Sequence, residues 1–188
     1  MRRRNSSTEP KRREFLQRPN VVAGMLELRA TRTANGYPMT YWLMKSEPGD
    51  YSIDDLERDK MEPWDGIRNY QVRNMIRDDM AIGDDVLFYH SSCKVPGAVG
   101  LAKIVSDAYP DPTQFDPRNK HFDPKSKEEE PRWLLRDVAF ERKLDRVIPL
   151  KELKAHPALA DFRLNQRGNR LSVFPIDARH WKLILSLE

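Results

Sequence analysis

DVLFYHSSCKVPGAVGLAKIVSDAY, residues 85–109, is the stretch that decides the fold. Its first seven and last twelve residues are rich in aromatic and aliphatic side chains, which is typical of β-strands. Pro96 and Gly97 form a turn signal between the two runs. Because no helix separates them, the stretch predicts neighbouring strands of an antiparallel or mixed sheet and argues against a doubly wound parallel sheet.

The residues before this stretch predict another strand and two helices. Residues 40–45, TYWLMK, form an aromatic and apolar run that predicts a buried strand. Ser52 followed by Asp55 resembles a capping box, the pattern that starts many helices. Apolar residues recur at helical spacing over residues 70–80, which predicts a second helix with one buried face.

The residues after this stretch predict a long loop and then more short elements. Residues 109–131 are rich in proline and charge, and ordered loops of this length are often functional. We expect further strands at 133–140 and 170–174, and short helices at 150–154, 157–161 and after Asp177. The fold class is therefore α+β: a small β-barrel of five or six mixed strands with short peripheral helices.

Charge divides the chain into two parts. Residues 1–38 carry nine Lys or Arg and three Asp or Glu, whereas residues 39–188 carry 24 basic and 26 acidic residues. We expect residues 1–38 to be a basic, disordered leader, and Met39 is a second candidate for the true start. The domain itself is residues 39–188, and its nearly neutral charge excludes nucleic-acid binding by charge alone.

Several function classes lack their sequence signals. The single cysteine, Cys93, forms no intramolecular disulfide or thiolate metal site, and the four histidines show no metal-ligand spacing. The common phosphate-loop, dinucleotide, zinc-protease and serine-hydrolase motifs are absent. We therefore expect no metal, no cofactor and no enzyme. No apolar run is long enough for a membrane span, and we expect a monomer in the cytoplasm, or in the nucleus if the source is eukaryotic.

Two segments near the first strand carry candidate binding residues. Lys45 and Ser46 stand where that strand ends, although an exposed charge and a turn cap explain them equally simply. Trp64 stands in a short loop, where an indole either packs into the core or offers a flat face for stacking a base. Asn69 follows it, and its amide either caps a helix or reads the edge of a base.

Two further segments lie later in the chain. Strand alternation places Phe88 and His90 on one face and Tyr89 and Ser91 on the other. Taken alone, His90 is more simply explained as a structural histidine than as a base or a ligand. Near the last expected strand, Arg170 and its neighbours follow a Gly-Asn turn, where they are either solvated or part of a site.

Read together, these strings resemble the EVE domain family, within the wider PUA-like superfamily. The resemblance implies a PUA-like β-barrel and a pocket that accepts a flipped-out base, as in the related YTH readers of methylated adenine. Trp64 matches a cage tryptophan, Lys45 and Ser46 match a Lys-Ser pair, and the other cage residues transfer less directly. The matching strings span residues 41–48, 64–76, 85–104, 109–117, 123–133 and 167–176.

The leading hypothesis is a binding module that recognises a modified nucleobase in DNA or RNA through an aromatic pocket. Trp64 would stack the base from an open position at the rim of the barrel, Asn69 and Ser46 would bond its edge, and Lys45 or Arg170 would face a phosphate or carbonyl. The full candidate site is Trp42, Lys45, Ser46, Trp64, Asn69, Tyr89, His90, Ser91, Arg170 and Ser172.

Two other hypotheses stay open at this point. Related PUA-like domains of the ASCH group include small amidohydrolases, and a hydrolase acting on a modified nucleoside could use Lys45 and Glu47, which share one face of the first strand. A protein-interaction module could use the charged loop at residues 120–132, although such charge runs are usually solvated surface.

Overall fold

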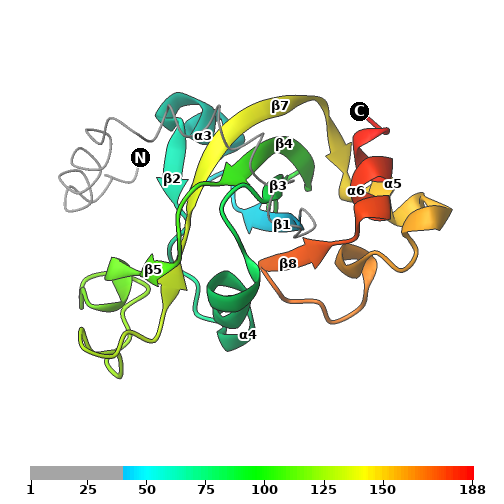
Figure 1. Ribbon diagram of the computed structural model, residues 1–188. Helices are drawn as coiled ribbons and strands as arrows, with labels where there is room; N and C mark the ends of the chain where they lie inside the picture. The colour runs from blue at the N-terminus through cyan, green and yellow to red at the C-terminus, as the bar shows by residue number, and fades with distance from the viewer. Residues whose placement is uncertain (1–39) are drawn as a thin grey trace, which may run out of the picture. The chain divides into compact units, whose positions relative to one another are not determined.

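The computed structural model describes residues 40–188 (Figure 1), so the predicted leader at 1–38 lies outside the described residues. Six strands form one curled mixed sheet in the order β2-β7-β4-β3-β1-β8, and two form a small second sheet. The strands are β1 (Tyr41–Ser46), β2 (Met61–Pro63), β3 (Asp85–His90), β4 (Gly97–Ile104), β5 (Tyr109–Pro110), β6 (Leu134–Leu135), β7 (Asp137–Pro149) and β8 (Val173–Ile176).

Short helices surround this sheet. As the sequence predicts, the first one begins at a capping box in which Ser52 and Asp55 each bond the backbone N–H of the other. In Figure 1, α5 and α6 lie on one side of the sheet, while β5 and the long loop beside it lie on the other. The helices and helical turns are α3 (Ile53–Asp59), α4 (Tyr70–Asn74), η1 (Met75–Asp79), η2 (Pro112–Gln114), α5 (Leu150–Ala155), η3 (Pro157–Leu159), η4 (Arg163–Asn165) and α6 (Ala178–Leu185).

The strand pairing mixes parallel and antiparallel neighbours. β1 lies between β3, to which it is parallel, and β8, to which it is antiparallel. The hairpin of β3 and β4 confirms the expectation from residues 85–109, and its one bulge, with the two between β4 and β7, curls the sheet. The edge strands β2 and β8 do not pair with each other within residues 40–188, so the sheet is an open half-barrel.

Strand β2 is one of the elements that sequence reasoning missed. It has only three residues and ends at Pro63, which lacks an N–H and is tolerated only where a strand forms the edge of a sheet. A segment this short carries no alternation of apolar and polar residues, so nothing in its sequence distinguishes it from the loop that follows.

The core corrects the expectation for Trp42. This residue is 1% exposed, and its indole Nε1 donates a hydrogen bond to the buried carboxylate of Asp84 at 3.0 Å. Asp84 also accepts from the backbone N–H groups of Thr40 at 3.3 Å and Ala81 at 2.8 Å. Asp84 therefore fastens the start of β1 to the turn before β3, and Trp42 serves the core rather than an open cage.

We predict that Asp84→Ala strongly destabilises the fold. The substitution leaves the buried donors of Trp42 and Ala81 without their acceptor, and each such loss costs about 1–3 kcal/mol. Urea unfolding should show a loss of about 3 kcal/mol or more, with a smaller loss for Asp84→Asn, which keeps one oxygen. An alanine variant as stable as the native chain would refute this role.

Candidate functional site

The carboxyl ends of β1 and β3 meet at one edge of the sheet because the two strands are parallel. Lys45 pairs in register with Tyr89, and Ser46 pairs with His90. The next residue, Ser91, donates its backbone N–H to the Ser46 carbonyl at 2.8 Å. On the other side of β1, Lys45 donates its backbone N–H to the Ser172 carbonyl at 2.8 Å. We call this group of six residues, Lys45, Ser46, Tyr89, His90, Ser91 and Ser172, the β1–β3 edge.

On one face of the edge, His90 has a structural hydrogen bond. Its Nε2 accepts the backbone N–H of Ile53 at 3.1 Å, which fixes the start of α3. Burial lowers the pKa of His90, although the charge of Asp54 opposes this effect, so the imidazole is neutral near pH 7. The rings of Phe88 and His90 lie 5.8 Å apart, which confirms that they share a face of β3. The hydroxyl of Ser46 donates to the Tyr51 carbonyl at 2.5 Å.

On the other face, Lys45 is a half-buried cation. Its Nζ lies 5.4 Å from the centroid of the Phe174 ring, and no carboxylate of residues 40–188 forms an ion pair with it. Burial lowers the pKa of Lys45 because the ammonium is partly removed from water. A desolvated ammonium without a protein counter-charge favours an anionic or carbonyl-bearing ligand.

Tyr89 lies beside Lys45 in the strand register and is 2% exposed. Burial, with a smaller effect of Cys93, raises the pKa of Tyr89 to about 12. Its phenol is therefore protonated at neutral pH. This side chain adds an aromatic ring and a neutral hydroxyl to the face that carries the Lys45 ammonium.

Trp64 packs behind the β1–β3 edge and is 8% exposed. Its ring meets Phe88 edge to face, with centroids 5.4 Å apart, and its backbone N–H donates to the Arg136 carbonyl at 3.0 Å. The expectation of an indole standing open at the rim is therefore wrong. The reason is β2, which carries the chain along the sheet up to Pro63 and so directs the next side chain into the half-barrel.

Asn69 and Arg170 are two predicted residues for which the structure shows no hydrogen bond or ring contact with the β1–β3 edge. Asn69 is exposed, and its Oδ1 caps α4 by accepting the N–H groups of Gln71 at 2.9 Å and Val72 at 3.1 Å. The cap uses only the oxygen and leaves the amide NH2 as a donor. Arg170 is exposed on the segment before β8, two residues from Ser172.

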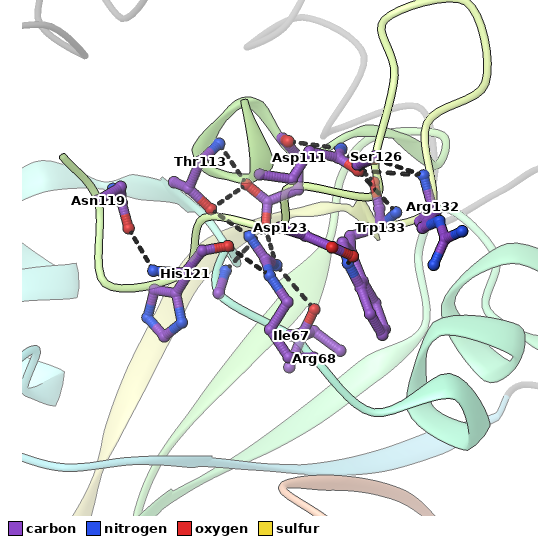
Figure 2. Close-up of polar contacts among 12 residues, drawn as sticks. Ile67, Arg68, Asp111, Thr113, Asn119, His121, Asp123, Ser126, Arg132 and Trp133 are labelled. Atoms are coloured by element: carbon purple, nitrogen blue, oxygen red, sulfur yellow. Dashed lines mark hydrogen bonds and ion pairs between the residues drawn. The ribbon is translucent and has the colours of Figure 1, made fainter. Parts of the chain in front are cut away.

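A polar network around Arg68 is the feature that sequence reasoning did not find (Figure 2). The guanidinium donates to the Asp111 carboxylate at 2.8 Å, to the Thr113 hydroxyl at 2.9 Å and to the His121 carbonyl at 2.7 Å. Asp111 also accepts the backbone N–H of Gly66 at 2.9 Å. One buried carboxylate thus fastens the loop after β5 to the segment that follows Trp64.

Other residues of this loop form hydrogen bonds with Trp133. Gln114 donates to the Trp133 carbonyl at 2.9 Å, and the indole N–H of Trp133 donates to Asp123 at 2.7 Å (Figure 2). The Trp133 ring lies 4.7 Å from that of Tyr70, and the Arg68 guanidinium lies 5.5 Å from it. The one sequence signal was Asp-Pro-Thr at residues 111–113, which is typical of a side-chain-capped turn.

Asp65 follows Trp64 in the chain and lies near the Arg68 network, because the charges of Asp111 and Arg68 act on its carboxylate. Its side chain is exposed, yet its surroundings raise its pKa to about 6: partial desolvation has the largest effect, and the nearby Asp111 carboxylate adds to it. Arg68 and Lys120 act in the opposite direction. This carboxylate therefore changes charge just below neutral pH, next to Trp64.

The fold and the edge define a small half-barrel module, and the chain is a member of the EVE domain family, whose model matches residues 40–187. It is 46% identical to mouse thymocyte nuclear protein 1 over 183 residues, which cover 87% of this chain and 80% of the relative. A crystal structure of human THYN1 in complex with DNA containing 5-methylcytosine is similar, with a TM-score of 0.73, 45% identity, and coverage of 79% and 96% of the two chains.

A bacterial protein of known structure is equally similar. The Pseudomonas syringae protein PSPTO5229 has a TM-score of 0.75 and 48% identity, with coverage of 78% of this chain and 98% of its own. Within residues 40–188, no helix has the length and apolar character of a membrane span. The same residues contain no cluster of three His, Cys, Asp or Glu side chains able to hold a metal ion.

We predict that Arg68→Lys loosens the loop without unfolding the sheet. Lysine cannot replace the fork that bonds three acceptors at once. Hydrogen exchange should accelerate across residues 111–123 while β1 and β3 stay protected. Unchanged exchange in the loop would show that Arg68 does not hold it.

We predict that Asp65→Asn stabilises the protein by an amount that grows from about pH 4 to about pH 6 and is complete above that pH. The folded-state pKa lies above the unfolded value, so stability falls as pH rises from about 4 to about 6 and stays lower beyond. Solvent screens this exposed side chain, so the gain at pH 7.5 should be about 1 kcal/mol or less. Thermal melts of both forms should differ at pH 7.5 and coincide below pH 4; a difference that persists at pH 3.5 would contradict the assignment.

Proposed function

We propose that this chain binds nucleic acid carrying a methylated base and holds that base at the β1–β3 edge. The observation that carries the proposal is the similarity to human THYN1, whose crystal structure is of a complex with DNA containing 5-methylcytosine. The similarity spans nearly the whole of that chain at 45% identity, so 5-methylcytosine in DNA is the first ligand to test.

The polar groups of the edge suit a base with a carbonyl and an amine. On one face, Lys45 supplies a cation without a counter-charge, suited to a base carbonyl or a phosphate. On the other, the Ser46 hydroxyl donates to Tyr51 and keeps an acceptor lone pair for an exocyclic amine. The exposed amide of Asn69 is a further donor, and the Ser91 hydroxyl, which donates to the Ser46 carbonyl, is a further acceptor; we assign both to the base or its sugar-phosphate.

We assign Trp64 to the back wall of the site. Because the indole is buried and meets Phe88 edge to face, we assign it the role of an apolar wall rather than an open stacking surface. A base methyl group is read by apolar contact, which an indole provides. Stacking between parallel rings is then not the main source of affinity. Hydrogen bonds at the β1–β3 edge contribute more than stacking to the selectivity for the base.

A hydrolase built on Lys45 and Glu47 is less well supported by the geometry. Glu47 is exposed, and its carbonyl accepts the backbone N–H groups of Asp50 and Tyr51 at 2.9 Å each in a turn. Lys45 lies over Phe174, and no hydrogen bond or ion pair joins it to Glu47. We therefore propose a binding module rather than an enzyme.

The protein-interaction hypothesis loses its main argument as well. Within the charged loop at 120–132, the Asp123 carboxylate accepts the indole N–H of Trp133, and the Lys120 ammonium pairs with Asp50. These two charges are therefore used by contacts within the domain. Residues 39–188 are the proposed binding domain, and its location in the cytoplasm, or in the nucleus of a eukaryotic cell, stays a prediction.

The direct test compares two labelled single strands that differ only in one central cytosine or 5-methylcytosine. Fluorescence anisotropy should show at least roughly tenfold tighter binding of the methylated strand, which corresponds to about 1.4 kcal/mol. Equal affinity for the two strands would contradict the proposal, and duplexes with the same base change would show whether base opening weakens binding.

We predict that Lys45→Met weakens binding to both strands by about tenfold and leaves the fold at least as stable. Methionine keeps the packing on Phe174 and removes a desolvated charge. Lys60→Met is the matched control, because Lys60 also lies over a phenyl ring, that of Phe140, at 5.9 Å. Equal binding losses in the two variants would mean that Lys45 has no specific role.

A further inference from the structure

The segment before β8 contains cations and no acid. Residues 162–176, FRLNQRGNRLSVFPI, include three arginines and neither aspartate nor glutamate. The segment joins the β1–β3 edge through the hydrogen bond from the Lys45 N–H to the Ser172 carbonyl. We call the arginines of this segment, Arg163, Arg167 and Arg170, the basic loop.

The basic loop differs from the other arginines of residues 40–188. None of its three guanidinium groups forms an ion pair or a hydrogen bond within these residues. Arg73 and Arg132 at least bond to neighbouring polar groups. All the remaining arginines pair with a carboxylate: Arg58, Arg68, Arg77, Arg118, Arg136, Arg142, Arg146 and Arg179.

The nearest acidic residue in sequence, Asp161, is already paired. Its carboxylate bonds Arg179 and lies 3.0 Å from the His180 Nε2, so it leaves the basic loop uncompensated. Among the arginines of residues 40–188, the three that have no hydrogen-bond or ion-pair partner therefore all lie in this one segment.

Two of the cations share one aromatic ring. The Arg163 guanidinium lies 5.9 Å from the centroid of Phe174, and the Lys45 Nζ lies 5.4 Å from the same centroid. Two like charges held near one ring repel each other, and an anion bound close to both would offset that repulsion. A cation of the β1–β3 edge and a cation of the basic loop therefore lie near the same ring.

Hydrogen bonds within the basic loop hold its backbone in one conformation. The Asn169 amide donates to the Arg163 carbonyl at 2.9 Å, and its oxygen accepts the Leu171 N–H at 3.1 Å. Gly168 has φ of 78°, a left-handed conformation that glycine adopts without strain. The backbone between the arginines is therefore held in one turn, and the ligand need not order it.

We propose that the basic loop binds the phosphodiester backbone that flanks the recognised base, with Arg163 and Lys45 nearest to the base and Arg167 and Arg170 farther along the strand. This inference rests on the proposed function. It assigns the sequence-independent part of the affinity to three arginines, while the β1–β3 edge reads the base. The nearly neutral charge of the domain then agrees with nucleic-acid binding, because three arginines without a partner in residues 40–188 lie together in one segment.

The test measures how the dissociation constant for a strand of about 12 nucleotides with one central 5-methylcytosine depends on salt from about 50 to about 300 mM. The variant is Arg163→Ala, Arg167→Ala and Arg170→Ala combined. Its control combines Arg77→Ala, Arg142→Ala and Arg146→Ala, which removes the same charge from ion-paired arginines on η1 and β7. Thermal melts check that both fold.

The slope of log affinity against log salt should become shallower by about two in the basic-loop variant, since each phosphate contact on a single strand contributes about 0.7. The control should keep the native slope, and both variants should keep the native preference for the methylated strand. Equal slopes in the variant and the control would overturn the inference and would favour a different occupant, such as an acidic protein segment.

Outcomes for the native protein separate the two proposals. If it binds both strands equally but the basic-loop variant still loses slope, methyl recognition fails and the backbone assignment stands. If it binds neither strand, both proposals fail. If the triple variant does not fold, Arg167→Glu replaces it, because the exposed Arg167 side chain has no partner in residues 40–188. A native salt slope in Arg167→Glu would likewise overturn the inference.

Discussion

The parallel pairing of β1 with β3 is the constraint on which the rest of the structure depends. It brings two strand ends, 45 residues apart in the chain at Ser46 and Ser91, to one edge of the sheet. At the other end of the pair, the buried Asp84 carboxylate bonds the backbone before β1 and the indole of Trp42. That buried carboxylate adds to the backbone pairing that fixes the register of the two strands.

Local sequence patterns predicted most of the elements. The capping box at Ser52 and the hairpin at residues 85–109 follow from side-chain chemistry within a few positions. The last strand was expected at residues 170–174 but begins at Val173. The shift has a physical reason: the Asn169 side chain bonds the backbone locally and holds the preceding residues in a turn.

The candidate site was only partly predictable. Lys45, Ser46, Tyr89 and His90 meet because strand alternation and parallel register place them together. Trp42 and Trp64 are large apolar residues near the edge, and a single sequence does not distinguish a pocket wall from a core ring. The Arg68 network joins residues more than 40 positions apart, so its partners became visible only once the fold brought Asp111 to Gly66.

The most direct measurement of the central claim is the hydrogen-exchange footprint of DNA containing 5-methylcytosine on the intact protein. The account predicts added protection at Lys45, Ser46 and residues 89–91, extending into residues 163–172, with little change in α6. Protection confined to the charged loop at 120–132, or none at the ends of β1 and β3, would contradict it.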